Sequence, residues 1–219
     1  DEYFGKGRSG ILARFGIKFF RKKLQGWDVK SSKRVDYFIA NSKNIAEKVK
    51  KYYNRDAEVI YPPVDTEKFT PTSEQTEDFY LVVSAFAPYK RVDLAIEAFN
   101  ILGYPLKIIG SGQDEKRLKK MAKQNIEFLG FLHEEKIRSY YTRCKALIFP
   151  GEDDFGITPV EAMACGKPVL AYGKGGARET VLEGITGEFF SEPTVDSMES
   201  GLARLMLNER NYNPLHCRK

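Results

Sequence analysis

The chain has 219 residues, of which 30% are charged and 42% hydrophobic, a composition typical of a globular protein. This length supports one full hydrophobic core plus a fragment, or two small domains. No apolar run approaches the length of a membrane span. The cysteines and histidines lack the spacing of a metal or redox site; they are Cys144, Cys165, Cys217, His133 and His216. We therefore expect reduced thiols in or near a core, and no metal site.

Charge is divided unevenly along the chain. Residues 1–55 carry 15 Lys/Arg and 5 Asp/Glu, a net charge of +10, whereas the remainder carries 20 and 25, a net charge of −5. A basic segment in front of an acidic body indicates an anionic partner for the first part only. Nucleic acid is not the expected partner, because no recognition fold or base-stacking signature accompanies the positive charge.

The first part of the chain is predicted to form two basic helices around one short strand. Residues 35–40 are the strand candidate, and Asn41 or Ser42 is placed to cap the helix that runs to Tyr53. In the first helix, residues 11–24, apolar side chains recur near helical spacing with Lys and Arg on the other faces. Two interpretations of this helix stay open: packing on a neighbouring domain, or contact with an anionic membrane surface.

From Phe79 onward, predicted strands and helices alternate. The strand candidates are residues 79–84, 106–109, 126–129, 146–149, 169–171 and 188–190. The helix candidates are residues 91–102, 114–122, 134–142, 158–165, 177–182 and 194–207. Apolar strands alternating with helices predict an α/β fold, a parallel sheet with helices on both faces. Ligands in such sheets bind at the carboxyl ends of the strands.

Residues 145–181 carry the most informative pattern in the sequence. An apolar strand runs into an acidic, glycine-containing loop, which opens a helix with Pro159 just inside its start. The free N–H groups and positive dipole end of such a helix suit a phosphate. Asp153 and Glu161 flank this point at a spacing of eight, with Glu161 expected in the first helical turn. Helix capping explains Glu161 tolerably, whereas a glycosidase acid pair is disfavoured because a phosphate-binding loop lies between the two carboxylates.

This segment resembles the acidic signature of retaining family 4 glycosyltransferases with the GT-B fold. The signature is E-x7-E, followed by A-M-A/C-G-x-P-V and G-G-x-x-E, and Asp153 stands where the family usually has Glu. Residues 31–69 resemble the end of the N-terminal domain and the interdomain crossing in bacterial and archaeal mannosyltransferases of this family. The resemblance therefore implies two parts: residues 1–62, a remnant of the N-terminal acceptor domain, and residues 63–219, a Rossmann-like domain that binds a nucleotide sugar.

The resemblance also implies roles for the acidic segment. Glu161 is expected to bond the ribose hydroxyls, and Asp153 to contact the donor sugar as one of two catalytic residues. The diphosphate is expected on the backbone N–H groups at the start of the helix. The donor-binding residues of this loop are Phe155, Gly156, Ile157 and Thr158.

A second block carries the other catalytic residue. Residues 84–91 follow the first strand of the alternating region and end in Lys90 and Arg91. Both suit a diphosphate, because Lys offers a compact positive charge and Arg a planar guanidinium that can donate two hydrogen bonds. Taken alone, two solvated cations at a helix start explain them better. The block resembles the family's P-x-K-R/G-x-D-x-x-I-x-A-F element, which implies that Lys90, with Arg91, neutralises the departing β-phosphate without a metal or other cofactor. Ala85 stands where many family members carry Arg.

Two further loops resemble donor-binding elements of the family. Gly110 and Gly112 form a G-x-G that follows the second strand of the alternating region; a tight turn explains them at least as well as ligand contact. The loop of Gly130, Phe131 and Leu132 resembles the one whose backbone edge meets the nucleotide base.

The resemblance implies transfer of a hexose, mannose from GDP-mannose being favoured, with retention of anomeric configuration. The acceptor would be a glycan or a lipid-linked glycan in polysaccharide or lipopolysaccharide synthesis. The expected location is cytoplasmic. The membrane interpretation of the basic helix adds peripheral contact at the inner face of the membrane through residues 11–24. The alternatives are a UDP-sugar donor, or a nucleotide-sugar-binding module without turnover. Because the acceptor domain is mostly missing, we expect these 219 residues to bind donor without transferring sugar.

Overall fold

The computed structural model describes the backbone of residues 11–218 and the side chains of residues 20–218. The chain divides into two compact units, with the boundary between Tyr61 and Pro62. The longest helix described is α1 (Ile11–Ser32), with 22 residues, and no helix in this part of the chain combines the length and apolarity that a membrane span requires.

The N-terminal unit contains α1, α2 (Lys43–Tyr53) and a pair of parallel two-residue strands, β1 (Ile39–Ala40) and β2 (Glu58–Val59). Ser42 is the N-cap of α2, as predicted, because its side chain accepts a hydrogen bond from the N–H of Ile45 at 3.1 Å.

The predicted strand at residues 35–40 is shorter than expected. The carbonyls of Val35 and Asp36 accept hydrogen bonds from the guanidinium of Arg55, at 3.1 and 2.9 Å. A side chain therefore satisfies the backbone groups that a longer strand would have paired, and regular pairing begins only at β1.

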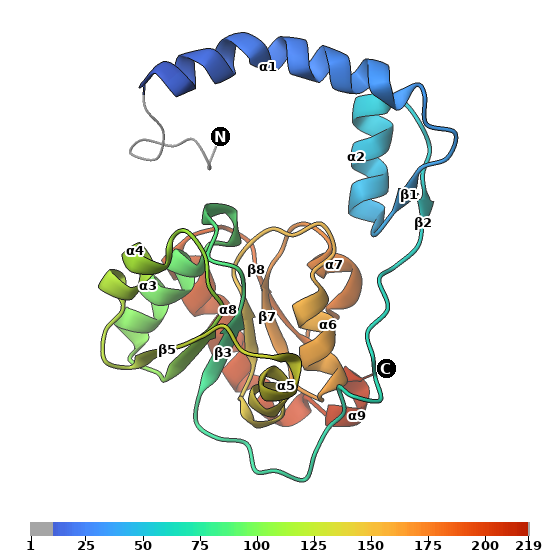
Figure 1. The fold of residues 1–219 in the computed structure, drawn as a ribbon. Helices are drawn as coiled ribbons and strands as arrows, with labels where there is room; N and C mark the ends of the chain where they lie inside the picture. The colour runs from blue at the N-terminus through green and yellow to red at the C-terminus, as the bar shows by residue number, and fades with distance from the viewer. Residues whose placement is uncertain (1–10, 219) are drawn as a thin grey trace. The chain divides into compact units, whose positions relative to one another are not determined.

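The C-terminal unit is built on a six-stranded parallel sheet with the order β5-β4-β3-β6-β7-β8. Its strands are β3 (Tyr80–Val83), β4 (Leu106–Ile109), β5 (Ile126–Gly130), β6 (Leu147–Phe149), β7 (Val169–Tyr172) and β8 (Gly187–Phe190). Its helices are α3 (Val92–Leu102), α4 (Glu115–Met121), α5 (Glu134–Arg143), α6 (Ile157–Ala164), α7 (Ala177–Thr180), α8 (Val195–Leu207) and α9 (Pro214–Cys217), with short 3₁₀ turns η2 (Pro88–Lys90) and η3 (Glu209–Asn211). The predicted α/β class, a parallel sheet with helices on both faces, is confirmed (Figure 1).

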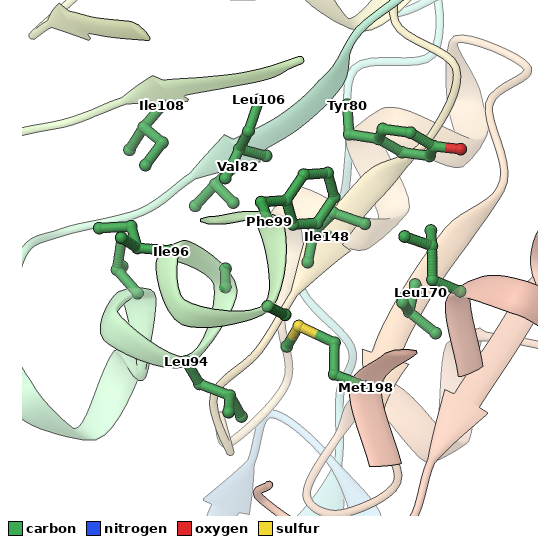
Figure 2. Packing of buried hydrophobic residues seen from close by; sticks show 14 of the residues in the cluster. Tyr80, Val82, Leu94, Ile96, Phe99, Leu106, Ile108, Ile148, Leu170 and Met198 are labelled. Atoms are coloured by element: carbon green, nitrogen blue, oxygen red, sulfur yellow. The ribbon is translucent and has the colours of Figure 1, made fainter. Parts of the chain in front are cut away.

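Alternation of side chains along the strands produces two separate cores, one on each face of the sheet. Tyr80 and Val82 point into the core formed with α3, α4 and α8, whereas Leu81, between them, points into the core formed with α5, α6 and α7. Figure 2 shows the first core, in which Phe99 and Met198 meet strand residues from the sheet. Because both faces are covered, the central strands β3, β6 and β7 carry no charged residue, and this made the alternation of strands and helices recognisable in the sequence.

The strand order reverses direction at β3. The chain first adds β4 and β5 on one side of β3, and then returns to add β6, β7 and β8 on the other. The loops that leave β3 and β6 consequently diverge at the carboxyl edge of the sheet, where doubly wound folds hold their ligands. The loops after β3 and β6 are therefore where a ligand is expected to bind.

We predict that Met198→Ala lowers the free energy of unfolding by about 2–5 kcal/mol, because the side chain is fully buried between α8 and the sheet. Met206→Ala is the matched control on the same helix, since Met206 is 37% exposed and its truncation leaves a smaller cavity. Urea denaturation followed by circular dichroism measures both. Equal losses from the two variants would contradict the packing described for this face.

Candidate functional site

Lys90 and Asp153 form an ion pair across the point where the strand order reverses. Lys90 ends η2 in the loop after β3, and Asp153 lies in the loop after β6. The Lys90 Nζ lies 2.6 Å from both carboxylate oxygens of Asp153, and the two side chains are 19% and 23% exposed. The two residues that the sequence assigned to different parts of a ligand therefore contact each other directly.

Close backbone packing fixes Lys90 in position. A Cβ on Gly151 would lie 2.8 Å from the Lys90 Cα, so only glycine lets the loop after β6 approach η2 this closely. Arg91 then adopts a left-handed backbone conformation, φ 51°, which is uncommon for a residue with a Cβ. Its side chain donates to Asp93 at 3.4 Å, so the guanidinium lies against the start of its own helix, whereas the Lys90 ammonium contacts Asp153.

The acidic loop is fixed from its other side by the glycine pair after β7. The N–H of Gly176 donates to the carbonyl of Asp153 at 2.9 Å. A Cβ on Gly175 would lie 2.3 Å from the same carbonyl oxygen. The G-G-x-x-E element therefore packs directly against the backbone of Asp153 and limits where its carboxylate can lie.

The start of α6 lies one residue before the predicted start at Thr158. The helix begins at Ile157, after Gly156 with φ 87°, and no side chain of the described chain caps it. The first N–H groups of α6, including those of Ile157 and Thr158, are thus left for another acceptor. The Phe155 side chain is buried and is not exposed for contact with a ligand.

Glu161 lies in the second turn of α6, not in the first, so the expected first-turn position is wrong. The predicted helix began at Thr158 with Pro159 just inside it, whereas α6 begins at Ile157 and Pro159 is its third residue. A capping role does not explain Glu161 at this depth in the helix. Its carboxylate instead accepts a hydrogen bond from the Tyr141 hydroxyl at 2.9 Å, and burial raises its pKa.

A cavity of about 330 Å³ opens beside these elements at the carboxyl ends of β3, β4 and β5. It includes four of the residues predicted to bind a ligand: Gly110, Phe131, Leu132 and Thr158. The turn before Phe131 is made at Gly130, φ 71°, and leaves the Phe131 ring 71% exposed. Such a cavity, with an apolar wall and backbone edges, suits a flat heterocycle.

The two glycines of the G-x-G element have a packing role that the sequence left open. A Cβ on Gly110 would lie 1.8 Å from the carbonyl oxygen of Ser84, and one on Gly112 would lie 2.6 Å from that of Phe86. Gly110 also lines the cavity, whereas Gly112 does not. Close packing therefore explains both glycines, and Gly110 in addition forms part of the cavity wall.

Tyr141 is the site residue that sequence reasoning missed. It is fully buried on α5, and buried tyrosines generally find a partner for their hydroxyl. The sequence carries that general signal, but it does not identify Glu161, twenty residues later, as the partner.

Residues 63–216 match the family described as glycosyl transferases group 1. The chain belongs to this family. Over 179 residues it is 32% identical to an uncharacterised glycosyltransferase of Methanocaldococcus jannaschii, MJ1178, a match that covers 80% of this chain and 50% of the relative. It is 29% identical over 206 residues to the alpha-1,3/1,6-mannosyltransferase ALG2 of Dictyostelium discoideum, covering 81% and 48%.

The fold also matches solved glycosyltransferase structures. A mutant of TarM from S. aureus, solved in complex with fondaparinux, alpha-GlcNAc-glycerol and UDP, superposes with a TM-score of 0.77 at 17% identity, covering 90% of this chain and 42% of that one. Both the predicted family and the predicted fold are confirmed. The chain spans about half the length of the curated relatives it matches.

We predict a coupling of about 1–2 kcal/mol between Lys90 and Asp153, because a partly buried, charge-assisted pair is screened less than a surface pair. The measurement is a double-mutant cycle on unfolding free energy with Lys90→Met and Asp153→Asn. The control cycle uses Lys119→Met and Glu115→Gln, an exposed pair at 2.7 Å on α4, for which we expect about 0.3–0.5 kcal/mol. A Lys90–Asp153 coupling no larger than the control would contradict the structural role given to the pair.

Proposed function

We propose that the C-terminal unit binds a nucleotide sugar at its carboxyl sheet edge, and that the parent protein is a retaining mannosyltransferase using GDP-mannose. The observation that carries this proposal is the convergence at one edge of an apolar cavity, a helix start without a side-chain cap and the Lys90–Asp153 pair. An aromatic base, a diphosphate and a hydroxyl-rich sugar are chemically matched to these three features in turn.

Each part of the donor has a partner in this proposal. The base enters the cavity beside Phe131, and the diphosphate takes the N–H groups at the start of α6 and the Lys90 ammonium. The ribose hydroxyls bond the Oε1 of Glu161 in this scheme, since the Oε2 already accepts a hydrogen bond from Tyr141. The donor sugar contacts Asp153.

In this scheme the ion pair is exchanged when the donor binds. Lys90 turns from Asp153 to the β-phosphate, and the released carboxylate accepts hydrogen bonds from sugar hydroxyls. As the glycosidic bond breaks, negative charge grows on the departing diphosphate, where Lys90 and the α6 dipole stabilise it. We propose that the reaction is metal-independent, since these groups supply the positive charge that the leaving group needs.

The names of relatives support the proposed donor, and calorimetry with GDP and UDP tests its base. The mannosyltransferase named among the relatives supports mannose, whereas UDP is present in the TarM complex, a protein related here by fold alone. A UDP-sugar donor is therefore the competing choice, and a binding module without turnover is the competing class. Because the chain matches only about half of its relatives, sugar transfer to a glycan or lipid-linked acceptor is proposed for a protein that also contains an acceptor domain.

We predict that Glu161→Gln weakens binding of the nucleoside diphosphate by about 1.5–3 kcal/mol, because it removes a charged acceptor for the ribose hydroxyls. Isothermal calorimetry with GDP and UDP on the wild type and the variant measures the loss and selects the base. Glu97→Gln, an exposed carboxylate on α3, is the control and should bind like the wild type.

Two results would contradict the proposed function. If neither GDP nor UDP binds the wild type at millimolar concentration, the sheet edge is not a nucleotide site. If Glu161→Gln and Glu97→Gln both bind like the wild type, the ribose is not held by Glu161.

The proposal includes peripheral contact of α1 with an anionic membrane. The predicted contact covered residues 11–24, and the side chains of residues 11–19 lie outside the described part of the chain. In the described part, Phe20, Leu24 and Trp27 are 51%, 61% and 63% exposed. Exposed Arg and Lys side chains at positions 21–23 lie among them. Apolar and aromatic groups with adjacent cations suit the interface of an anionic bilayer.

We predict that the chain floats with phosphatidylserine vesicles at low salt and is released as salt rises, because surface charges are screened within a Debye length. Replacing Arg21, Lys22 and Lys23 by Gln should weaken binding more than tenfold, at about 1 kcal/mol for each charge. The control replaces Lys43, Lys50 and Lys51 on α2, which removes the same charge elsewhere in the unit. If the two triple variants bind the vesicles equally well, the membrane contact of α1 is contradicted and packing on a neighbouring domain is favoured.

A further inference from the structure

Tyr141 is a fully buried side chain whose hydroxyl contacts Glu161, a residue of the proposed donor site. Its ring lies in the core between α5, α6 and the sheet and meets the edge of Phe69, with ring centroids 6.0 Å apart. The hydroxyl donates to the Glu161 Oε2 at 2.9 Å. The ring is locked by packing, so the hydroxyl is a fixed donor with a fixed acceptor.

Glu161 needs such a donor because its surroundings oppose its charge. Burial is the main cause of its raised pKa, and the carboxylate of Glu134 on α5 adds to the effect. The Tyr141 hydroxyl acts in the opposite direction and lowers the pKa of Glu161. Cys165, one turn further along α6, stays a neutral thiol because burial raises its pKa to about 12.

The charge of Glu134 is itself partly offset by Lys68, whose Nζ lies 3.3 Å from its carboxylate. The Tyr141 hydroxyl keeps its own proton, since burial and the nearby Glu161 carboxylate hold its pKa well above the usual value. Tyr141 therefore acts as a donor to Glu161 throughout the physiological pH range.

We propose that Tyr141 is a positioning residue for nucleotide binding, which holds the Glu161 carboxylate charged and aimed at the ribose of the donor. This inference rests on the proposed function and extends it to a residue that does not itself touch the ligand. A carboxylate already held through Oε2 loses little rotational freedom when the ribose binds Oε1, so the site is preorganised.

The proposal predicts that nucleotide affinity decreases as the pH falls. Ribose hydroxyls donate to the anionic form of Glu161, so nucleotide affinity is complete above the pKa of Glu161 and is lost as the pH falls through it. Tyr141→Phe removes the group that lowers this pKa and leaves the ring in place. Affinity should then fall away at a higher pH than in the wild type.

The test compares Tyr141→Phe with Tyr140→Phe, the neighbouring residue on α5, whose ring packs against Phe79 at a centroid distance of 6.2 Å. Calorimetry with the nucleoside diphosphate that binds the wild type is repeated from about pH 5 to 8. We expect Tyr141→Phe to bind about tenfold more weakly at neutral pH, with its pH midpoint raised by about one unit. Tyr140→Phe should match the wild type in both respects.

A second measurement does not depend on a ligand. The carbon-13 carboxyl signal of Glu161, assigned by its loss in Glu161→Gln, reports its titration in the free protein. We expect a higher midpoint in Tyr141→Phe than in the wild type or Tyr140→Phe. Melting curves recorded alongside separate a simple loss of stability, which would lower the melting temperature without moving either pH midpoint.

The possible outcomes distinguish the positioning role of Tyr141 from the proposed nucleotide binding. If the wild type binds nucleotide and the pH profile of Tyr141→Phe coincides with it, the positioning role is overturned while the proposed function stands. If the wild type binds no nucleotide, both are overturned, and the carboxyl titration then shows only whether Tyr141 tunes Glu161.

Discussion

The ion pair between Lys90 and Asp153 is the interaction on which the carboxyl edge of the sheet depends. It joins the loops that leave β3 and β6, the two strands at which the fold reverses direction. Without it, an ammonium and a carboxylate would lie partly buried and unmatched, at a cost greater than that of an exposed pair. The pair also presents two opposite charges next to each other. A ligand with phosphate and hydroxyl groups can replace each residue's partner, the phosphate binding Lys90 and the hydroxyls binding Asp153. Both side chains are already partly removed from water, so this replacement costs little further desolvation.

Glycine residues allow the close backbone approach that holds this ion pair in place. Gly151 lies against Lys90, and Gly175 and Gly176 lie against the acidic loop. The backbone segments that carry the two charged side chains are therefore held close to each other by packing. Glu161 is held in a different way, through the buried hydroxyl of Tyr141. The proposed donor site thus combines an ion pair that a ligand could exchange with closely packed surroundings, an arrangement suited to preorganised electrostatic stabilisation.

Much of the fold was predictable because both faces of the sheet are covered. The continuous apolar strands and the intervening helices were read correctly, and β4 was placed at its observed ends. Interactions between side chains and distant backbone were not readable: Arg55 shortens the first predicted strand, and Tyr141 reaches Glu161 from another helix. The sequence identified Lys90 and Asp153 separately, but their contact depends on the strand order, which alternation alone does not determine.

The exchange of Lys90 from Asp153 to phosphate is the central claim, and a ligand comparison tests it most directly. Calorimetry of a nucleoside diphosphate and its parent nucleoside, on the wild type and on Lys90→Met, isolates the contribution of the phosphates. The account predicts that the preference for the diphosphate falls at least about tenfold in Lys90→Met while nucleoside affinity is unchanged. An unchanged preference for the diphosphate would contradict it, since Lys90 would then serve only as the structural partner of Asp153.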